Sequence, residues 1–408
     1  MFLRLIRLTA VLLATMLLAV GCGGGGSAEP PKEGLAVTST TQSTAVVTWN
    51  MTAGVEYWLF FGPTSLAPTN TTSADKWIGI LGGNTIIKAT SPMAIPGLVN
   101  GTSYSFTINA RTGGGPGGPV ATPVTVTPQA AGSKWVTATP SPMGTADLRG
   151  IAVGTAAVAV GAKGAMYASA DTVSWGPINP VTTNNLNAVA WSTSFFAVGD
   201  SGTILQSRDA ITWTPQNSGL TKNLYGVATN GALTVAVGAS GTIITSADGI
   251  TWTAATTNPA TTDLLSVAYL NGAWYATGVG GTLMYSADGL TWVARTSGTT
   301  SDLRALTYGV ASGATSALFV AAGANGTLLT STDGVTWVAQ TLPVTTIYSL
   351  DLGLQFVAVG SDGKIFNSVN GLSWTAVASP TINDLYATRY GLTSFMAVGV
   401  AGTNIYSH

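Results

Sequence analysis

The residues that could perform acid–base, nucleophilic or metal chemistry are few in this sequence. Its 408 residues include one histidine, His408, and one cysteine, Cys22. A single histidine argues against Ser-His-Asp or Cys-His catalysis, and a single cysteine excludes an intramolecular disulfide or a Cys/His zinc site. Charged residues make up only 8% of the chain, and its 15 Lys and Arg residues form no basic stripe for nucleic acid. We expect no metal, no cofactor and no nucleic-acid partner.

The carboxylates beyond residue 134 are the remaining candidates for catalysis. This part of the chain has no Glu and twelve Asp, and all but Asp351 occupy slots that recur along the sequence. Five lie in a tight-turn motif: Asp171, Asp209, Asp248, Asp288 and Asp333. Four precede an apolar run: Asp147, Asp263, Asp302 and Asp384. Two lie in glycine hairpins: Asp200 and Asp362. A glycosidase needs two opposed carboxylates, one of them with a raised pKa. We therefore predict that the protein is not an enzyme.

These slots belong to one repeated unit, which must position them. The unit runs Ala-Val-Gly, two residues, Gly-Thr-Ile, then Ser-x-Asp-Gly-x-Thr-Trp, and its best copies end at residues 246–252 and 286–292. Successive tryptophans are 37 to 45 residues apart: Trp135, Trp175, Trp213, Trp252, Trp292, Trp337 and Trp374. A period near 40 with no helical pattern is typical of the four short strands of a β-propeller blade.

The first and last copies of the unit are both incomplete. Trp135 has no strands of its own unit before it, and the last copy stops at His408 without an Asp-Gly-x-Thr-Trp segment. The two fragments complete one another. We therefore predict a seven-bladed propeller over residues 134–408, in which the N-terminal strand pairs into the C-terminal blade and removes the open sheet edges.

The tight-turn motif has a structural explanation in each copy. Its Asp accepts backbone N–H bonds across the turn, and its Gly supplies a positive φ angle. Thr172 and Ala210 replace this Gly in two copies, and Asn370 replaces the Asp in another. The motif resembles the Asp-box of BNR repeats and is similar to repeats in photosystem II assembly-factor propellers. A sialidase resembling that family would carry an arginine triad and a Tyr–Glu pair, neither of which is visible here.

Asp351 is the acidic residue without a repeated slot. In the register of the repeats it corresponds to Arg389 of the following unit. We predict a buried Asp351–Arg389 ion pair between blades six and seven.

One slot differs from copy to copy. It follows the first leucine of each unit, and a small residue comes after it. Its occupants are Arg149, Asn187, Tyr225, Leu265, Arg304, Tyr348 and Tyr386. By strand alternation these side chains point away from the small neighbours and would form a ring near one mouth of the channel. Tyr and Arg dominate recognition surfaces, so the polar members are candidate ligand-binding residues. The alternative is that they are ordinary packing or exposed residues.

The first 33 residues predict a targeting signal and a linker rather than a folded domain. Arg4 and Arg7 precede an apolar run over residues 8–20, which is the length of a signal sequence and too short to span a membrane as a helix. Small residues then lead to Cys22, which resembles a bacterial lipobox. The resemblance implies cleavage after residue 21, lipidation of Cys22 and retention at the outer membrane of a bacterial cell envelope. Residues 22–33 form a Gly-rich linker.

Residues 34–128 predict a small β-sandwich, because short alternating runs lie between turn signals. Trp49 and the corner-like segment ending at Tyr104 resemble a fibronectin type III domain. That resemblance implies a hydrogen bond between the Tyr104 hydroxyl and the backbone near Leu98. Trp58 and Trp77 could form a carbohydrate platform, but core packing is the favoured interpretation.

The fold class expected is therefore all-β, a fibronectin type III-like sandwich followed by a seven-bladed propeller. The function expected is a non-enzymatic lipoprotein, a monomer that binds a protein or glycan at the cell surface through the propeller mouth. Two alternatives stay open. One is an extracellular carbohydrate-active enzyme of the propeller glycosidase type, and the other is an assembly factor for a membrane complex.

Overall fold

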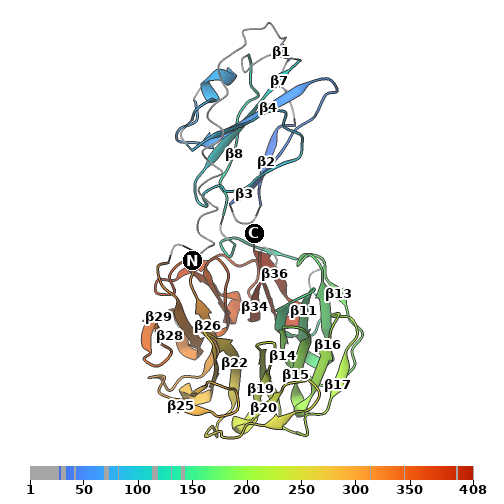
Figure 1. Ribbon diagram of the computed structural model, residues 1–408, viewed down its shortest axis with the longest axis vertical. Helices are drawn as coiled ribbons and strands as arrows, with labels where there is room; N and C mark the ends of the chain where they lie inside the picture. The colour runs from blue at the N-terminus through green and yellow to red at the C-terminus, as the bar shows by residue number, and fades with distance from the viewer. Residues whose placement is uncertain are drawn as a thin grey trace. The chain divides into compact units, whose positions relative to one another are not determined.

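A computed structural model of the chain describes residues 27–28, 34–40, 43–68, 73–80, 82–112, 118–129, 131–138, 143–312, 314–343, 345–391 and 394–407. The chain divides into two compact units, Met1–Pro128 and Gln129–His408 (Figure 1). Apart from short 3-10 turns, the described residues form strands and loops only. No described helix is long and apolar enough to cross a membrane. The all-β prediction is confirmed.

The first unit contains two antiparallel sheets. One has the order β2–β3–β6, and the other has the order β1–β7–β4–β5 with β8 also paired to β7. The bounds are β1 Ser27–Ala28, β2 Ala36–Thr40, β3 Thr44–Thr48, β4 Glu56–Pro63, η1 Ala74–Trp77, β5 Asn84–Ile86, β6 Met93–Ile95, β7 Tyr104–Arg111 and β8 Val124–Val126. Residues from both sheets, including Val47, Trp49, Leu59 and Phe106, share one core.

The larger sheet of the first unit is covered on both faces, so all eight residues of β7 are buried. A second apolar cluster, which includes Phe60, Trp77 and Val120, packs on the side away from the main core. Trp77 is only 1% exposed, and Trp58 packs against the same cluster. The described part of the long segment after β4 thus supplies core side chains. This agrees with the core-packing interpretation of the two tryptophans rather than with an open carbohydrate platform.

The second unit is a β-propeller of seven four-stranded sheets among the described residues. Blade 1 comprises β10 Leu148–Val153, β11 Ala157–Gly161, β12 Met166–Ser169 and β13 Gly176–Pro177. Blade 2 comprises β14 Leu186–Trp191, β15 Phe195–Gly199, β16 Ile204–Ser207 and β17 Thr214–Gln216. Blade 3 comprises β18 Leu224–Thr229, β19 Thr234–Gly238, β20 Ile243–Ser246 and β21 Thr253–Ala254. Blades 4 and 5 comprise β22 Leu264–Leu270, β23 Ala273–Gly278, β24 Leu283–Ser286, β25 Val293–Arg295; β26 Leu303–Gly309, β27 Leu318–Gly323, β28 Thr327–Ser331 and β29 Val338–Thr341. Blades 6 and 7 comprise β30 Ile347–Leu352, β31 Phe356–Gly360, β32 Ile365–Ser368, β33 Thr375–Val377; β34 Leu385–Gly391, β35 Ser394–Gly399, β36 Asn404–Ser407 and β9 Trp135–Thr137.

The seventh blade joins the two ends of the propeller segment. Strand β9 pairs antiparallel with β36, with Val136 opposite Tyr406 and Trp135 opposite Ser407. The red strands of this blade lie beside the green strands of blade 1 in Figure 1, and β34 packs against β10. The first strand of the propeller segment therefore pairs with the last one and closes the ring, as the incomplete first and last repeats predict.

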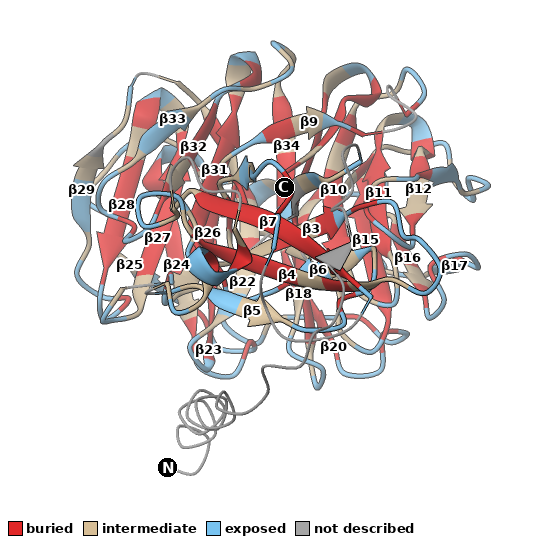
Figure 2. Ribbon diagram, turned by 90° about the horizontal axis from the view of Figure 1, so that it is seen from above, coloured by how far each residue is buried: buried red, intermediate tan, exposed pale blue. Residues whose placement is uncertain are grey.

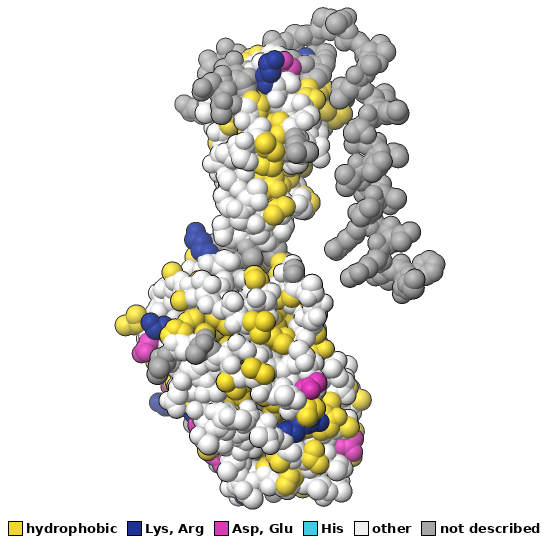
Figure 3. All heavy atoms as spheres, turned by 90° about the vertical axis from the view of Figure 1, so that its left-hand side faces the viewer, with side chains coloured by type: hydrophobic (Ala, Val, Ile, Leu, Met, Phe, Trp, Pro, Cys, Tyr) yellow, Lys and Arg dark blue, Asp and Glu magenta, His cyan; other side chains and the backbone are white. Residues whose placement is uncertain are grey.

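Burial explains why the second strand of each blade has a continuous apolar sequence. Strands β11, β15, β19 and β31 are buried at every residue, because neighbouring blades cover both of their faces. Buried residues follow the strands in Figure 2, whereas exposed residues gather in the connections. Charged side chains are few and scattered on the face that Figure 3 shows.

The Gly-x-x-Gly pattern of each repeat forms the turn between the second and third strands. These short 3-10 turns are η2 Ala162–Gly164, η3 Asp200–Gly202, η4 Ala239–Gly241, η5 Val279–Gly281, η6 Ala324–Gly326, η7 Ser361–Gly363 and η8 Val400–Gly402. A Cβ atom on Gly161 would lie 2.0 Å from the carbonyl oxygen of Asp147 in the same blade. One on Gly164 would lie 1.9 Å from the carbonyl oxygen of Thr182, in the connection to the next blade. Both glycines are therefore required by close packing.

Candidate functional site

The variable slot of the repeat lies at the central channel. All seven of its residues line one cavity of about 550 Å³: Arg149, Asn187, Tyr225, Leu265, Arg304, Tyr348 and Tyr386. They lie at the blade end that carries the η2–η8 turns, because the first residue of each inner strand pairs with the Gly that precedes the turn. We call these seven residues the mouth ring. None of the described residues that line the cavity is acidic.

A β-bulge sets the direction of every mouth-ring side chain. In each inner strand the register shifts at this slot, so that Arg149, for example, is the extra residue between the paired Leu148 and Gly150. The same shift occurs in the other six blades. The strict alternation expected from the sequence therefore fails here, because a bulge re-aims a side chain.

The small residue after each bulge packs against the adjacent blade. A Cβ atom on Gly150 would lie 3.0 Å from the Ala188 Cα, and one on Gly226 would lie 3.1 Å from the Ser266 Cα. The inner strands of neighbouring blades approach too closely here for a larger side chain. The slot beside it has no such constraint, which explains why it varies among the copies.

Three mouth-ring residues of blades 5 to 7 are in mutual contact. The rings of Tyr348 and Tyr386 lie 5.1 Å apart at an interplanar angle of 78°, and the Arg304 guanidinium lies 5.8 Å from the Tyr348 ring centre. Arg304 also forms an ion pair with Asp302 at 3.2 Å. These contacts restrict the orientations of the three side chains.

Blades 1 and 2 contribute a second connected group. Arg149 donates to the Asn187 Oδ1 atom at 2.9 Å, and the Asn187 amide donates to Asp200 and to the Leu224 carbonyl oxygen, both at 2.9 Å. The side chain of Asn187 is thereby fixed in one orientation, and it presents its oxygen to Arg149.

Two tyrosines of the mouth ring have a pKa above the ordinary value of a phenol. Burial raises the pKa of Tyr348 and of Tyr386, and the negative charge of Asp384 raises both further. The Tyr348 hydroxyl donates to Asp384 at 3.3 Å. At neutral pH both phenols are therefore hydrogen-bond donors.

The Asp or Asn before each inner strand links neighbouring blades. Its side-chain oxygen accepts a bond from the backbone N–H of the middle turn residue in the preceding blade, at 2.8–3.1 Å. The six pairs are Lys163–Asn185, Ser201–Asn223, Ser240–Asp263, Gly280–Asp302, Asp362–Asp384 and Ala401–Asp147. Between blades 5 and 6, Thr346 occupies this position, and no such bond is found there in the described part of the chain. Asp147, Asp263, Asp302 and Asp384 thus have a structural role that sequence spacing did not reveal.

The Asp-box turns have the geometry that their sequence predicts. The Oδ1 atoms of Asp171, Asp209, Asp248, Asp288, Asp333 and Asn370 each accept two backbone N–H bonds at 2.6–2.9 Å. These bonds lower the pKa of Asp171, Asp209 and Asp333 to about 2, and they lower the pKa of Asp248 and Asp288. Among the described residues, no three His, Cys, Asp or Glu side chains are grouped to hold a metal ion.

Six of the seven repeat tryptophans donate their indole N–H to a backbone carbonyl oxygen three residues earlier, whereas the indole nitrogen of Trp337 has no hydrogen-bond partner among the described residues. The indole N–H of Trp252 donates to the carbonyl oxygen of Gly249 at 3.3 Å, and five other tryptophans make the equivalent bond, including Trp135 to Gly132. Where Gly is replaced, Thr172 and Ala210 still adopt φ angles of 67° and 65°. The turn geometry is therefore kept even at the cost of a strained backbone.

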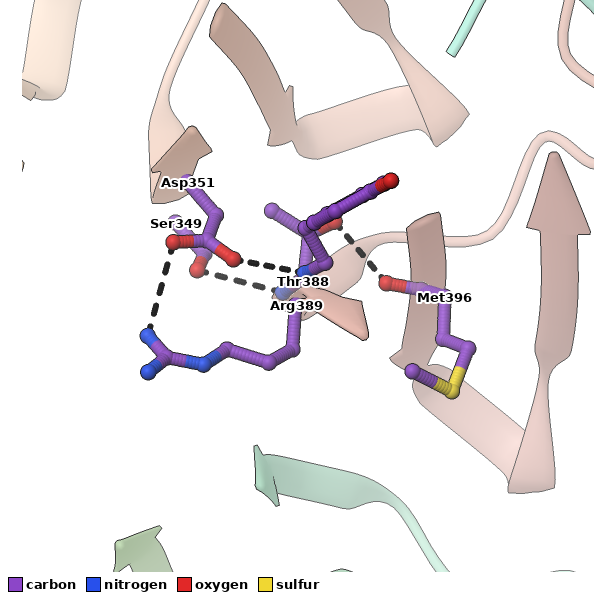
Figure 4. Close-up of polar contacts among 6 residues, drawn as sticks. Ser349, Asp351, Thr388, Arg389 and Met396 are labelled. Atoms are coloured by element: carbon purple, nitrogen blue, oxygen red, sulfur yellow. Dashed lines mark hydrogen bonds and ion pairs between the residues drawn. The ribbon is translucent and has the colours of Figure 1, made fainter. Parts of the chain in front are cut away.

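Asp351 and Arg389 are in contact, but not as the buried pair that we predicted. Their closest oxygen and nitrogen atoms are 3.4 Å apart, and the Asp351 side chain is 11% exposed, whereas that of Arg389 is 55% exposed. The shorter bond of Asp351 comes from the backbone N–H of Tyr390, at 2.6 Å. Ser349 accepts from the Thr388 N–H at 3.1 Å in the same way (Figure 4). The main role of Asp351 is therefore to bind the backbone of β34.

Several predictions concern residues outside those that the structure describes. The signal peptide at residues 1–21, the lipidation site Cys22 and His408 lie there. Only residues 27–28 of the predicted linker are described. In the first unit, the Tyr104 hydroxyl accepts a bond from the Val99 N–H at 3.2 Å, next to the predicted position.

Comparison with known proteins supports the propeller. The family model described as "DUF6242 beta propeller domain" matches residues 177–258 and 238–352. No curated protein matches the sequence.

Solved structures share the fold at low sequence identity. A structure described as "YCF48 bound to D1 peptide" has a TM-score of 0.55 and 14% identity, and the match covers 67% of this chain and 94% of that one. YCF48 from Cyanidioschyzon merolae has a TM-score of 0.55 and 17% identity, with 68% and 99% covered. The WD40 propeller of Doa1 has a TM-score of 0.55 and 13% identity, with 67% and 96% covered. These likenesses show a propeller and nothing finer.

Proposed function

We propose that this protein is a non-enzymatic binding or scaffold protein, and that its mouth ring receives a segment of a partner protein. The observation that carries the proposal is the convergence of all seven variable-slot residues on one cavity of about 550 Å³. Cavities of this size accommodate a short peptide or a small molecule rather than a folded domain. The ring is rich in Tyr and Arg, which are over-represented at recognition hot spots.

Two further observations support protein binding over catalysis. The described residues lining the cavity include no carboxylate, whereas a propeller glycosidase needs two in one mouth. A propeller of similar fold has been solved with a peptide bound. The assembly-factor alternative is a special case of the same proposal, in which the partner is part of a membrane complex.

The first unit and the N-terminus complete the proposal. We assign the first unit to a fibronectin type III-like spacer, supported by its two-sheet order and the Val99–Tyr104 bond. We also propose that Cys22 is lipidated and that the protein is held at the bacterial outer membrane. Metabolic labelling with a palmitate analogue should mark the wild-type protein and not Cys22→Ser.

The binding role is tested by crosslinking in intact cell envelopes followed by affinity purification. The wild-type protein should capture a discrete partner, and Tyr348→Ala/Tyr386→Ala should lose it, since both rings line the cavity. Tyr269→Ala is a matched control, because Tyr269 is 38% exposed and lies outside the cavity. Equal capture by the double variant and the wild type would refute the assignment of the mouth ring.

A further inference from the structure

We propose that the mouth ring recognises a carboxylate on the bound polypeptide segment, and that Arg149 is the residue that receives it. This inference rests on the function proposed above and adds the chemistry of the ligand. It depends on the asymmetry of the ring, on the charge partners of its arginines and on its supply of hydrogen-bond donors.

The mouth ring has a polar side and a less polar side. Around the channel, Arg304, Tyr348, Tyr386, Arg149 and Asn187 come from five consecutive blades, with blade 7 joined to blade 1. The two remaining members are Tyr225 and Leu265. A bound segment would therefore meet both arginines on one side of the ring, and one tyrosine and one leucine on the other.

Arg149 differs from the other two arginines of the cavity in forming no ion pair with a described residue. Arg304 pairs with Asp302 at 3.2 Å, and Arg389 pairs with Asp351 at 3.4 Å. The side-chain bond of Arg149 goes to the neutral Asn187 amide, and no ion pair to Arg149 occurs among the described residues. A positive charge at a cavity wall without an acidic partner favours an anionic ligand.

The mouth-ring neighbour of Arg149 in blade 7, Tyr386, adds a hydrogen-bond donor to the cavity. Burial and the charges of Asp384 and Asp147 raise the pKa of Tyr386, so its hydroxyl keeps its proton at neutral pH. The Asn187 oxygen already accepts a bond from Arg149. Because a guanidinium has five N–H donors and one bond uses only one of them, Arg149 keeps donors for a ligand. A carboxylate accepts from both Arg and Tyr, and such charge-assisted bonds are the strong ones.

A polypeptide offers a carboxylate from an Asp or Glu side chain or from its own C-terminus. The experiment uses the full chain to select from a random synthetic peptide library in four versions. Peptides have a free or an amidated C-terminus, and they contain or lack Asp and Glu. Loss of binding on amidation identifies the C-terminus, and loss on removal of Asp and Glu identifies a side chain.

Variants make the assignment to Arg149 specific. Arg149→Gln should weaken binding of the selected peptides by about tenfold or more, and Arg149→Lys should retain part of it, because the charge remains. Arg208→Gln should bind as the wild type does, since Arg208 is exposed and lies outside the cavity. Binding of these variants is compared after circular dichroism has shown that each one is folded.

Two sets of results contradict this inference. Selected peptides that bind without any carboxylate, or that bind Arg149→Gln as tightly as the wild type, overturn it and leave peptide binding by the propeller standing. Failure to select any peptide overturns both proposals. Binding of an acidic oligosaccharide such as oligogalacturonate in place of all peptides also overturns both.

Discussion

An Asp-box turn occurs in six of the blades and a mouth-ring residue in all seven, and the two features differ in what the repeats hold constant. In the six boxes that carry Asp or Asn, the side-chain oxygen, the two N–H donors and the positive φ are kept, even where Thr172 or Ala210 stands in place of Gly. In the ring, the bulge and the small following residue are kept, and the side chain that enters the channel differs. The backbone is thus fixed at both the Asp-box and the mouth-ring positions. Only at the mouth-ring position can the side chain vary and bind a ligand.

The largest effect should come from breaking the strand that closes the propeller. Trp135 is 5% exposed, bonds to the Gly132 carbonyl and packs against Phe395. Trp135→Ala should lower the free energy of unfolding by about 3–5 kcal/mol, as buried Trp-to-Ala changes do. Urea denaturation of the full chain measures this. A loss below about 1 kcal/mol would show that β9 is dispensable for closure.

Asp351 should rank second. Asp351→Ala removes the acceptor of the partly buried Tyr390 N–H, which should cost roughly 1–3 kcal/mol. Asp351→Asn keeps an oxygen at this position and should recover most of the loss, because the Arg389 side chain is 55% exposed and its charge stays solvated. Equal destabilisation by both variants in urea denaturation would instead show that Asp351 stabilises the fold mainly through its ion pair with Arg389.

A smaller, distributed effect should appear on acidification. The pKa of Asp171, Asp209 and Asp333 is about 2 in the folded protein, against about 3.9 in an unfolded chain. The unfolded state therefore binds protons first, so the contribution of the boxes is complete above about pH 4 and is lost as the pH falls toward 2. The melting temperature of the full chain should decline through this window. A melting temperature that stays constant from pH 5 to pH 2 contradicts this role of the box carboxylates.

The sequence predicts more of the propeller fold than of the mouth ring. Period, glycine placement and the incomplete terminal copies predict the propeller and its closure, because each reflects a local packing need that recurs in every blade. The bulge at the slot of Arg149 was not predicted, since alternation alone leaves no trace of an extra residue. A Leu, a variable residue and a small residue in succession, repeated in seven blades, is the signal that could have indicated it.

The sequence also does not predict the hydrogen bonds between neighbouring blades. Asp147, Asp263 and their equivalents accept hydrogen bonds from the preceding blade. The spacing of residues within one repeat cannot predict a contact between two repeats. The exposure of Arg389 was missed for the same reason. Alignment of the repeats places it opposite Asp351 but does not tell how far its side chain extends into the channel.

The most direct test of the difference between the box and the ring is to measure stability and binding on the same variant. Tyr348→Ala/Tyr386→Ala should keep its free energy of unfolding within about 1 kcal/mol of the wild type, as substitutions at partly exposed positions do, while losing its crosslinked partner in the envelope. If the double variant instead keeps the partner, or is destabilised as strongly as Trp135→Ala, the mouth-ring tyrosines stabilise the fold and are not a binding site.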